Sequence, residues 1–141
     1  MAQVTDLIGL GEHPLKAAIL ANGPVVATAL GTTLASASQI GGRQYFTICN
    51  TGTSGFQLPA VGGDANSAGK GALLGDEFVI ANLTAASVAL YAALTPAGST
   101  ITLYGGAVSY SGTTGVSIPS GYMAITRPFS VSSWILGVVS V

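Results

Sequence analysis

Residues 43–49, RQYFTIC, alternate in the way that decides the fold class of this chain. In an extended chain their side chains take two opposite faces, with Phe46 and Ile48 on one and Tyr45, Thr47 and Cys49 on the other. The next six residues, NTGTSG, hold two glycines and are typical of a turn. The stretch therefore predicts a β-strand that ends near residue 50.

The same rhythm continues to the end of the chain. Residues 99–104, STITLY, set Ile101 and Leu103 against hydroxyl side chains, and glycine- or proline-containing turns recur throughout. About eight to ten short strands at this spacing predict an all-β sandwich or barrel, jelly-roll-like, over residues 41–141. No helix-length apolar pattern lies between the strands, so a parallel fold built from βαβ units is not expected.

Residues 1–40 differ from the rest and predict an N-terminal arm. A short helix is expected over about residues 14–22, because Pro14 suits a first helical position and Asn22-Gly23 suits a C-terminal stop. A helix of two turns is not stable alone. It must dock through apolar anchors, for which the candidates are Leu7, Ile8, Leu10, Leu15 and Ile19.

Charge is scarce. Only nine of 141 residues are charged, or 6%, against about 25% in an ordinary soluble domain. The four cations, Lys16, Arg43, Lys70 and Arg127, are scattered singly. Nucleic-acid binding needs several phosphate contacts, so a nucleic-acid partner is not expected. Either neutral Ser, Thr and Gly residues cover the surface, or other chains bury much of it.

Membrane and secretion signals are also not expected. The best apolar window, residues 78–94, is interrupted by polar residues and falls short of the ~20 that a spanning helix needs. The N-terminus has no basic region of the kind a signal peptide carries. With a single cysteine, Cys49, no internal disulfide forms, and synthesis in a reducing cytoplasm is expected.

The sequence predicts no enzyme, cofactor or metal site. The only histidine, His13, lies in the arm, and Cys49 ends an apolar strand without a basic partner nearby except Arg43. Asp64 suits a glycine-rich turn. The adjacent Asp76 and Glu77 would point to opposite faces of a strand and would not converge on a substrate.

Apolar strand positions form the candidate core or subunit interface. These positions are Phe46, Ile48, Val88, Leu90, Ile101, Leu103 and Trp134. The tyrosines, scattered along the strands, are either half-buried structural residues or platforms that stack on sugars.

Several segments, in order, resemble capsid decoration or head-fibre proteins of tailed bacteriophages. They are RQYFTICNTGTSG, FQLPA with the glycine-rich loop, GDEFVIAN, ASVALYAA, GSTITLYGGA and IPSGYMAITRPFSVSSW, over about residues 42–141. The N-terminal LIGLG with its helix is similar to the arms by which such proteins engage the shell.

This resemblance implies a non-enzymatic homotrimer that binds the major capsid protein on the outside of the virion and decorates or reinforces the head. Two alternatives stay open. One is a fibre module of the virion that binds a receptor or a surface glycan, and the other is a jelly-roll capsid subunit.

Overall fold

The computed structural model of the chain describes residues 24–42, 44–52, 54–62, 71–94, 96–104, 109–111 and 114–140. Secondary structure in these residues consists of β-strands. They are β1 (Val25–Thr28), β2 (Ser38–Gln39), β3 (Phe46–Thr51), β4 (Gly55–Gln57), β5 (Phe78–Asn82), β6 (Val88–Tyr91), β7 (Thr100–Leu103), β8 (Ser109–Ser111), β9 (Val116–Ile118), β10 (Tyr122–Ser130) and β11 (Ser133–Ser140).

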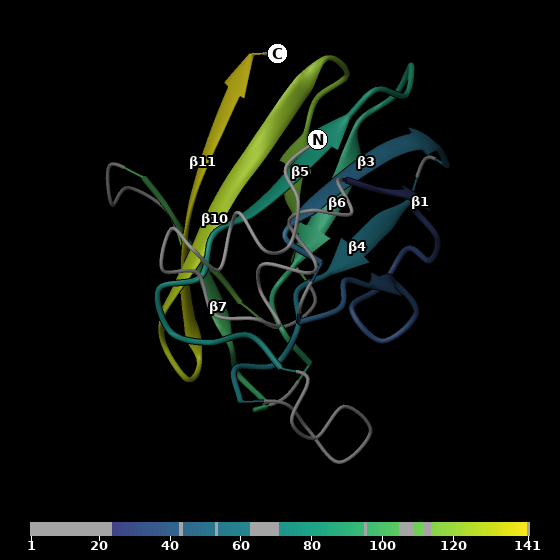
Figure 1. Ribbon diagram of the computed structural model, residues 1–141. Helices are drawn as coiled ribbons and strands as arrows, with labels where there is room; N and C mark the ends of the chain where they lie inside the picture. Colours follow the sequence, from purple (N-terminus) through teal and green to yellow (C-terminus); the bar gives the residue numbers. More distant parts are fainter. Residues whose placement is uncertain are drawn as a thin grey trace, which may run out of the picture.

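The strands form two sheets. The larger sheet has the order β1-β3-β5-β10-β11-β7-β8, and the smaller sheet has the order β2-β4-β6-β9. Figure 1 shows β11, β10, β5, β3 and β1 side by side across the larger sheet. The all-β, sandwich-like fold expected from the period-two pattern is confirmed.

Strand pairing differs from that of a jelly roll, which is built from antiparallel Greek keys. Five pairs are parallel: β1 with β3, β3 with β5, β2 with β4, β4 with β6, and β7 with β11. From β1 to β6 the chain alternates between the two sheets. Within this run, the chain between two parallel neighbours therefore passes through one strand of the other sheet. In an α/β fold a helix would make that connection.

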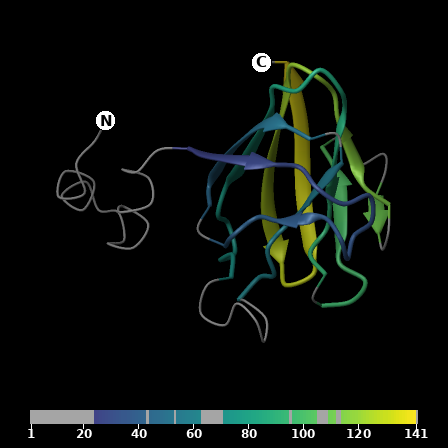
Figure 2. The same cartoon turned by 90° about the vertical axis from the view of Figure 1, so that its right-hand side faces the viewer.

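The β10–β11 hairpin runs the height of the β domain and joins the parallel strands to β7 (Figures 1 and 2). It turns at Val131-Ser132, beside an irregularity in the register between Pro128 and Ser130. The pairing of β10 with β5 ends at Thr126. Pro128 has no N–H to donate to a sheet ladder, and it lies beyond this one, so it does not interrupt it. The carbonyl of Pro128 still accepts a hydrogen bond from the Gly75 N–H at 3.1 Å.

The core lies between the sheets. From the larger sheet, Trp134 and Phe78 are fully buried with ring centroids 5.6 Å apart, and Tyr45 lies 5.3 Å from Phe78. Phe56 and Leu90 of the smaller sheet close the core from the other side. Of the strand residues named as core or interface candidates, Val88, Leu90, Ile101 and Trp134 are buried, and Leu103 packs half-buried against them.

One buried polar side chain organises an end of the sandwich. Asn82, at the end of β5, is completely buried and makes four hydrogen bonds. Its amide nitrogen donates to the carbonyls of Ala86 and Ile118, at 2.8 and 2.9 Å. Its amide oxygen accepts from the N–H and hydroxyl of Thr84, at 3.0 and 2.7 Å. Asn82 thus ties the loop after β5 to strand β9 of the opposite sheet.

The expected boundary between arm and β domain at residue 40 is too late. Strand β1 is part of the larger sheet and β2 is part of the smaller one, so residues 25–40 belong to the β domain. Polar and turn residues between these two short strands gave no period-two pattern from which to predict them. The expected helix at about 14–22 and the anchors Leu7, Ile8, Leu10, Leu15 and Ile19 lie outside the described residues.

Candidate functional site

The larger sheet is apolar on the side that faces away from the core. Alternate residues of its strands point inward, such as Ile80, Ala124 and Leu136, and all three are buried. Their neighbours point outward and are also apolar. An antiparallel or mixed sheet with one solvated face normally carries polar residues there. We call this surface the outer face and define it by Phe46, Ile48, Val79, Ala81, Met123, Ile125, Ile135, Gly137 and Val139.

Strand register arranges the outer face into rows. One row crosses four strands as Phe46, Val79, Ile125 and Gly137, and the next crosses them as Ile48, Ala81, Met123 and Val139. Directly opposed side chains lie about 4.5–5.5 Å apart between Cβ atoms, so each row is a continuous apolar ladder. The neighbours only partly shield one another, because Phe46, Ile135 and Val139 remain 40%, 38% and 41% exposed.

A single ion pair borders these rows. Both the Nε and Nη2 of Arg127 donate to one carboxylate oxygen of Glu77, the former at 3.1 Å. Arg127 opposes Ile135 across the β10–β11 hairpin. Among the described residues the only other charged side chain is Asp76, which is buried and accepts hydrogen bonds from the Tyr45 hydroxyl and the Leu73 N–H. Asp76 and Glu77 therefore point to opposite faces, as predicted.

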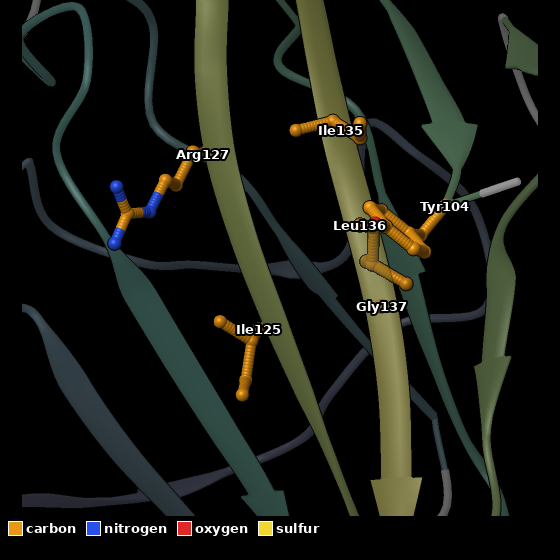
Figure 3. Close-up of a pocket in the computed structure, with 6 residues that line it drawn as sticks. All are labelled: Tyr104, Ile125, Arg127, Ile135, Leu136 and Gly137. Carbon is orange, nitrogen blue, oxygen red and sulfur yellow. The ribbon is translucent and has the colours of Figure 1, made fainter.

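The outer face is hollowed at Gly137. A cavity of about 300 Å³ is lined by Tyr104, Ile125, Arg127, Ile135, Leu136 and Gly137. Figure 3 shows these side chains on β10 and β11, with Tyr104 at the end of β7. A Cβ atom added to Gly137 would meet no atom within 4 Å, so the missing side chain leaves open space. Tyr104 is 84% exposed and forms one wall of the hollow.

The outward side of the smaller sheet has a different chemistry. Gly55, Ala89 and Ser117 form a cross-strand row of small residues. The ring of Tyr91 fills the space beside Gly55 and Gly115. A Cβ atom added to Gly55 would lie 2.7 Å from this ring, and one added to Gly115 would lie 3.0 Å from it. The Tyr91 hydroxyl donates to the carbonyl of Thr32 at 2.8 Å. This surface is neutral and carries a hollow of about 220 Å³ beside Ala89 and Ser117, and Tyr91 is held in place by its packing and its hydrogen bond.

The four tyrosines whose side chains the structure describes, Tyr45, Tyr91, Tyr104 and Tyr122, do not assemble into a sugar-stacking platform. Tyr45 and Tyr91 are buried, while Tyr104 and Tyr122 are exposed. Tyr104 lines the hollow of the outer face, whereas Tyr122 shares the strand parity of the core residue Ala124. Among the described side chains, the exposed tyrosines on which the glycan alternative depends therefore lie apart.

The residues considered for catalysis that the structure describes, Cys49, Asp76 and Glu77, do not converge. Cys49 is fully buried, and its thiol donates to the carbonyl of Thr51. His13 and Asp64 lie outside the described residues. Within the described part of the chain, no three His, Cys, Asp or Glu side chains gather as a metal site would require. Across the same residues, no helix has the length and apolar character needed to span a membrane.

Sequence reasoning found part of the outer face and missed the rest. Phe46 and Ile48 were candidates, and both point outward. Val79, Met123, Ile125, Ile135 and Val139 were missed. The signal was present as consecutive apolar residues, such as Val79-Ile80 and Ile135-Leu136, because strands with two apolar faces have runs and not alternation.

Comparison of this chain with protein-family models, curated proteins and solved structures gives no match.

Proposed function

We propose that this protein is a non-enzymatic structural component of a virion. In this proposal it binds the major capsid protein lattice on the outside of a tailed-bacteriophage head as a homotrimer, and decorates or reinforces the shell. The main observation behind the proposal is the apolar outer face, because exposed apolar surfaces of this kind are typical of proteins that bind other protein subunits. The resemblance of its segments to head decoration proteins supplies the virion setting.

The charge distribution supports the same proposal. Of the charged side chains in the described residues, Asp76 is buried and Glu77 is paired with Arg127. Obligate interfaces resemble a protein core cut in half and are depleted in charge. A subunit that is permanently assembled needs fewer surface charges than a protein that circulates alone.

Other functions receive less support from these surfaces. A glycan-binding fibre module of the kind considered above would gather exposed tyrosine rings on one face, and of the tyrosines whose side chains the structure describes, the exposed Tyr104 and Tyr122 lie on different faces. A jelly-roll capsid subunit would need antiparallel Greek-key pairing, which the parallel pairs of β1, β3 and β5 do not follow.

The test is direct examination of phage particles that carry this chain. Cryo-electron microscopy is expected to show trimeric density of this fold on the outer surface of the head. Particles lacking the chain should bind the purified full-length protein, and a variant without residues 1–24 should bind at least tenfold more weakly because the arm is lost. Density at the tail tip only, or equal binding by the truncated variant, would contradict the shell or arm assignment respectively.

A further inference from the structure

We infer that a second copy of this chain covers the outer face of the larger sheet, with Phe46 of one copy inserted into the hollow at Gly137 of its neighbour. This inference rests on the proposed function in so far as it names the surface through which copies associate. It concerns the β domain alone and does not depend on where the capsid would bind.

The area of the outer face matches what a stable protein interface needs. Six strands of the larger sheet lie side by side in the order β1-β3-β5-β10-β11-β7. At about 4.8 Å per strand they span about 29 Å. The five ladders between these strands pair four, four, four, eight and four residues, on average about five residues or 17 Å, which gives about 490 Å² in projection. Two such faces together cover about 1,000 Å², the lower limit for a specific interface. Projection underestimates accessible area because side chains protrude.

The outer face carries both a protrusion and a depression of matching size. Phe46 is 40% exposed at one end of a ladder, and Gly137 lies at the other end beside the 300 Å³ hollow. Three strand spacings separate the two positions, or about 14 Å. The Phe46 ring therefore does not reach the hollow of its own chain. A surface with both features is complementary to another copy of itself, in a two-fold contact or around a closed ring.

The electrostatics of the outer face also suit a second copy. Among the described residues, its border holds one cation, Arg127, and one anion, Glu77, already joined as an ion pair. Two identical faces therefore meet without net repulsion, whereas a face with one sign of charge would repel its copy. An anionic lipid surface would need unpaired Lys or Arg around the apolar area, and the only cation on the described outer face is paired.

Sedimentation and light scattering of the full-length protein test the inference over a range of protomer concentrations. Two variants alter the outer face: Ile125→Lys places a charge in a ladder, and Gly137→Leu fills the hollow. Each has a matched control elsewhere: Leu83→Lys changes a 54% exposed loop residue, and Ser87→Leu adds bulk at an exposed residue beside the smaller sheet. Circular dichroism and thermal melting verify that each variant is folded.

The wild-type protein and both controls are expected to associate above the 13.9 kDa monomer mass, while both outer-face variants associate at least tenfold more weakly. A wild-type monomer at every concentration, or folded Ile125→Lys and Gly137→Leu proteins that associate like wild type, would overturn the inference. A wild-type dimer that these variants dissociate supports the inference and refutes the proposed trimer. A trimer that they leave intact refutes the inference and leaves the proposed function standing.

Cross-linking tests the pairing of protrusion and hollow. Under mild oxidation the double variant Phe46→Cys/Gly137→Cys is expected to form disulfides between chains, because the two positions are too far apart within one chain. The buried native thiol of Cys49 does not compete. A folded double variant that stays uncross-linked under conditions where the wild-type protein associates would overturn the insertion of Phe46 into the hollow.

Discussion

Replacement of Asn82 by alanine is expected to destabilise the protein far more than a typical polar substitution. Asn82 is completely buried, and its side chain holds the carbonyls of Ala86 and Ile118 together with the N–H and hydroxyl of Thr84. Alanine makes none of these hydrogen bonds, so all four partner groups lose their bond to residue 82. The loop after β5 then loses its attachment to β9.

The magnitude follows from counting the bonds. A net contribution of about 1 kcal/mol for each of the four hydrogen bonds gives about 4 kcal/mol. The Thr84 hydroxyl shares its single proton between Asn82 and the carbonyl of Ala86 at 2.8 Å. In the variant it donates to Ala86 alone, which offsets part of the loss. We therefore expect the free energy of unfolding to fall by about 3 kcal/mol, which in a chain of this size lowers Tm by about 10 °C.

Urea denaturation and thermal melting at one fixed protomer concentration measure this change, since association would otherwise alter the apparent stability. Asn50→Ala is the control, because Asn50 is exposed and its amide oxygen accepts only a long bond from Thr51, so we expect a change within about 0.5 kcal/mol. Asn82→Asp keeps the side-chain volume but loses both donors, and is expected to be at least as damaging. A loss below about 1 kcal/mol in either Asn82 variant would refute the network as a main support of the fold.

Two further predictions concern the sheet surfaces. Gly55→Ala is expected to lower the free energy of unfolding by about 1–3 kcal/mol, because its new Cβ atom would lie 2.7 Å from the buried ring of Tyr91. The Cβ atom of Gly137→Ala meets open space, so the free energy of unfolding of the dilute protein is expected to stay unchanged or to rise slightly. Urea titrations of the two variants check this, and equal losses would contradict it. For the ion pair, a double-mutant cycle with Arg127→Ala and Glu77→Ala should give a coupling below about 1 kcal/mol that weakens with salt, because both side chains are exposed. A salt-independent coupling of several kcal/mol would contradict that expectation.

The strands could be predicted from the sequence because their pattern is local. STITLY alternates between inward Ile101 and outward hydroxyls, and the structure places β7 there with Ile101 fully buried. Trp134 was expected to anchor the core and does so. The alternation in RQYFTIC predicts the strand but does not predict which of its two faces is turned toward the core. Both faces carry apolar groups, and only tertiary structure decides that Tyr45 faces the core and Phe46 faces outward.

The path of the chain between sheets could not be predicted in the same way. Period-two alternation is identical for a strand that pairs with its sequence neighbour and for one that pairs two strands away. In this fold β1, β3 and β5 are parallel neighbours, and β2, β4 and β6 build the opposite sheet between them. Short turns between the segments are equally suited to hairpins and to crossings from one sheet to the other. Pairing order thus depends on contacts distant in sequence, which a local pattern does not contain.

The low charge content takes a more specific meaning once the two sheets are distinguished. The smaller sheet presents small neutral residues outward, such as Gly55, Ala89 and Ser117, and these can face water at little cost. The larger sheet presents ladders of Val, Ile, Met and Phe, for which water is a poor partner. One ion pair, at the border of these ladders, does not compensate for that area. Scarcity of charge is therefore compatible with exposure to water on the smaller sheet. On the larger sheet it favours contact with protein, and this difference between the two sheets supports the proposed assembly.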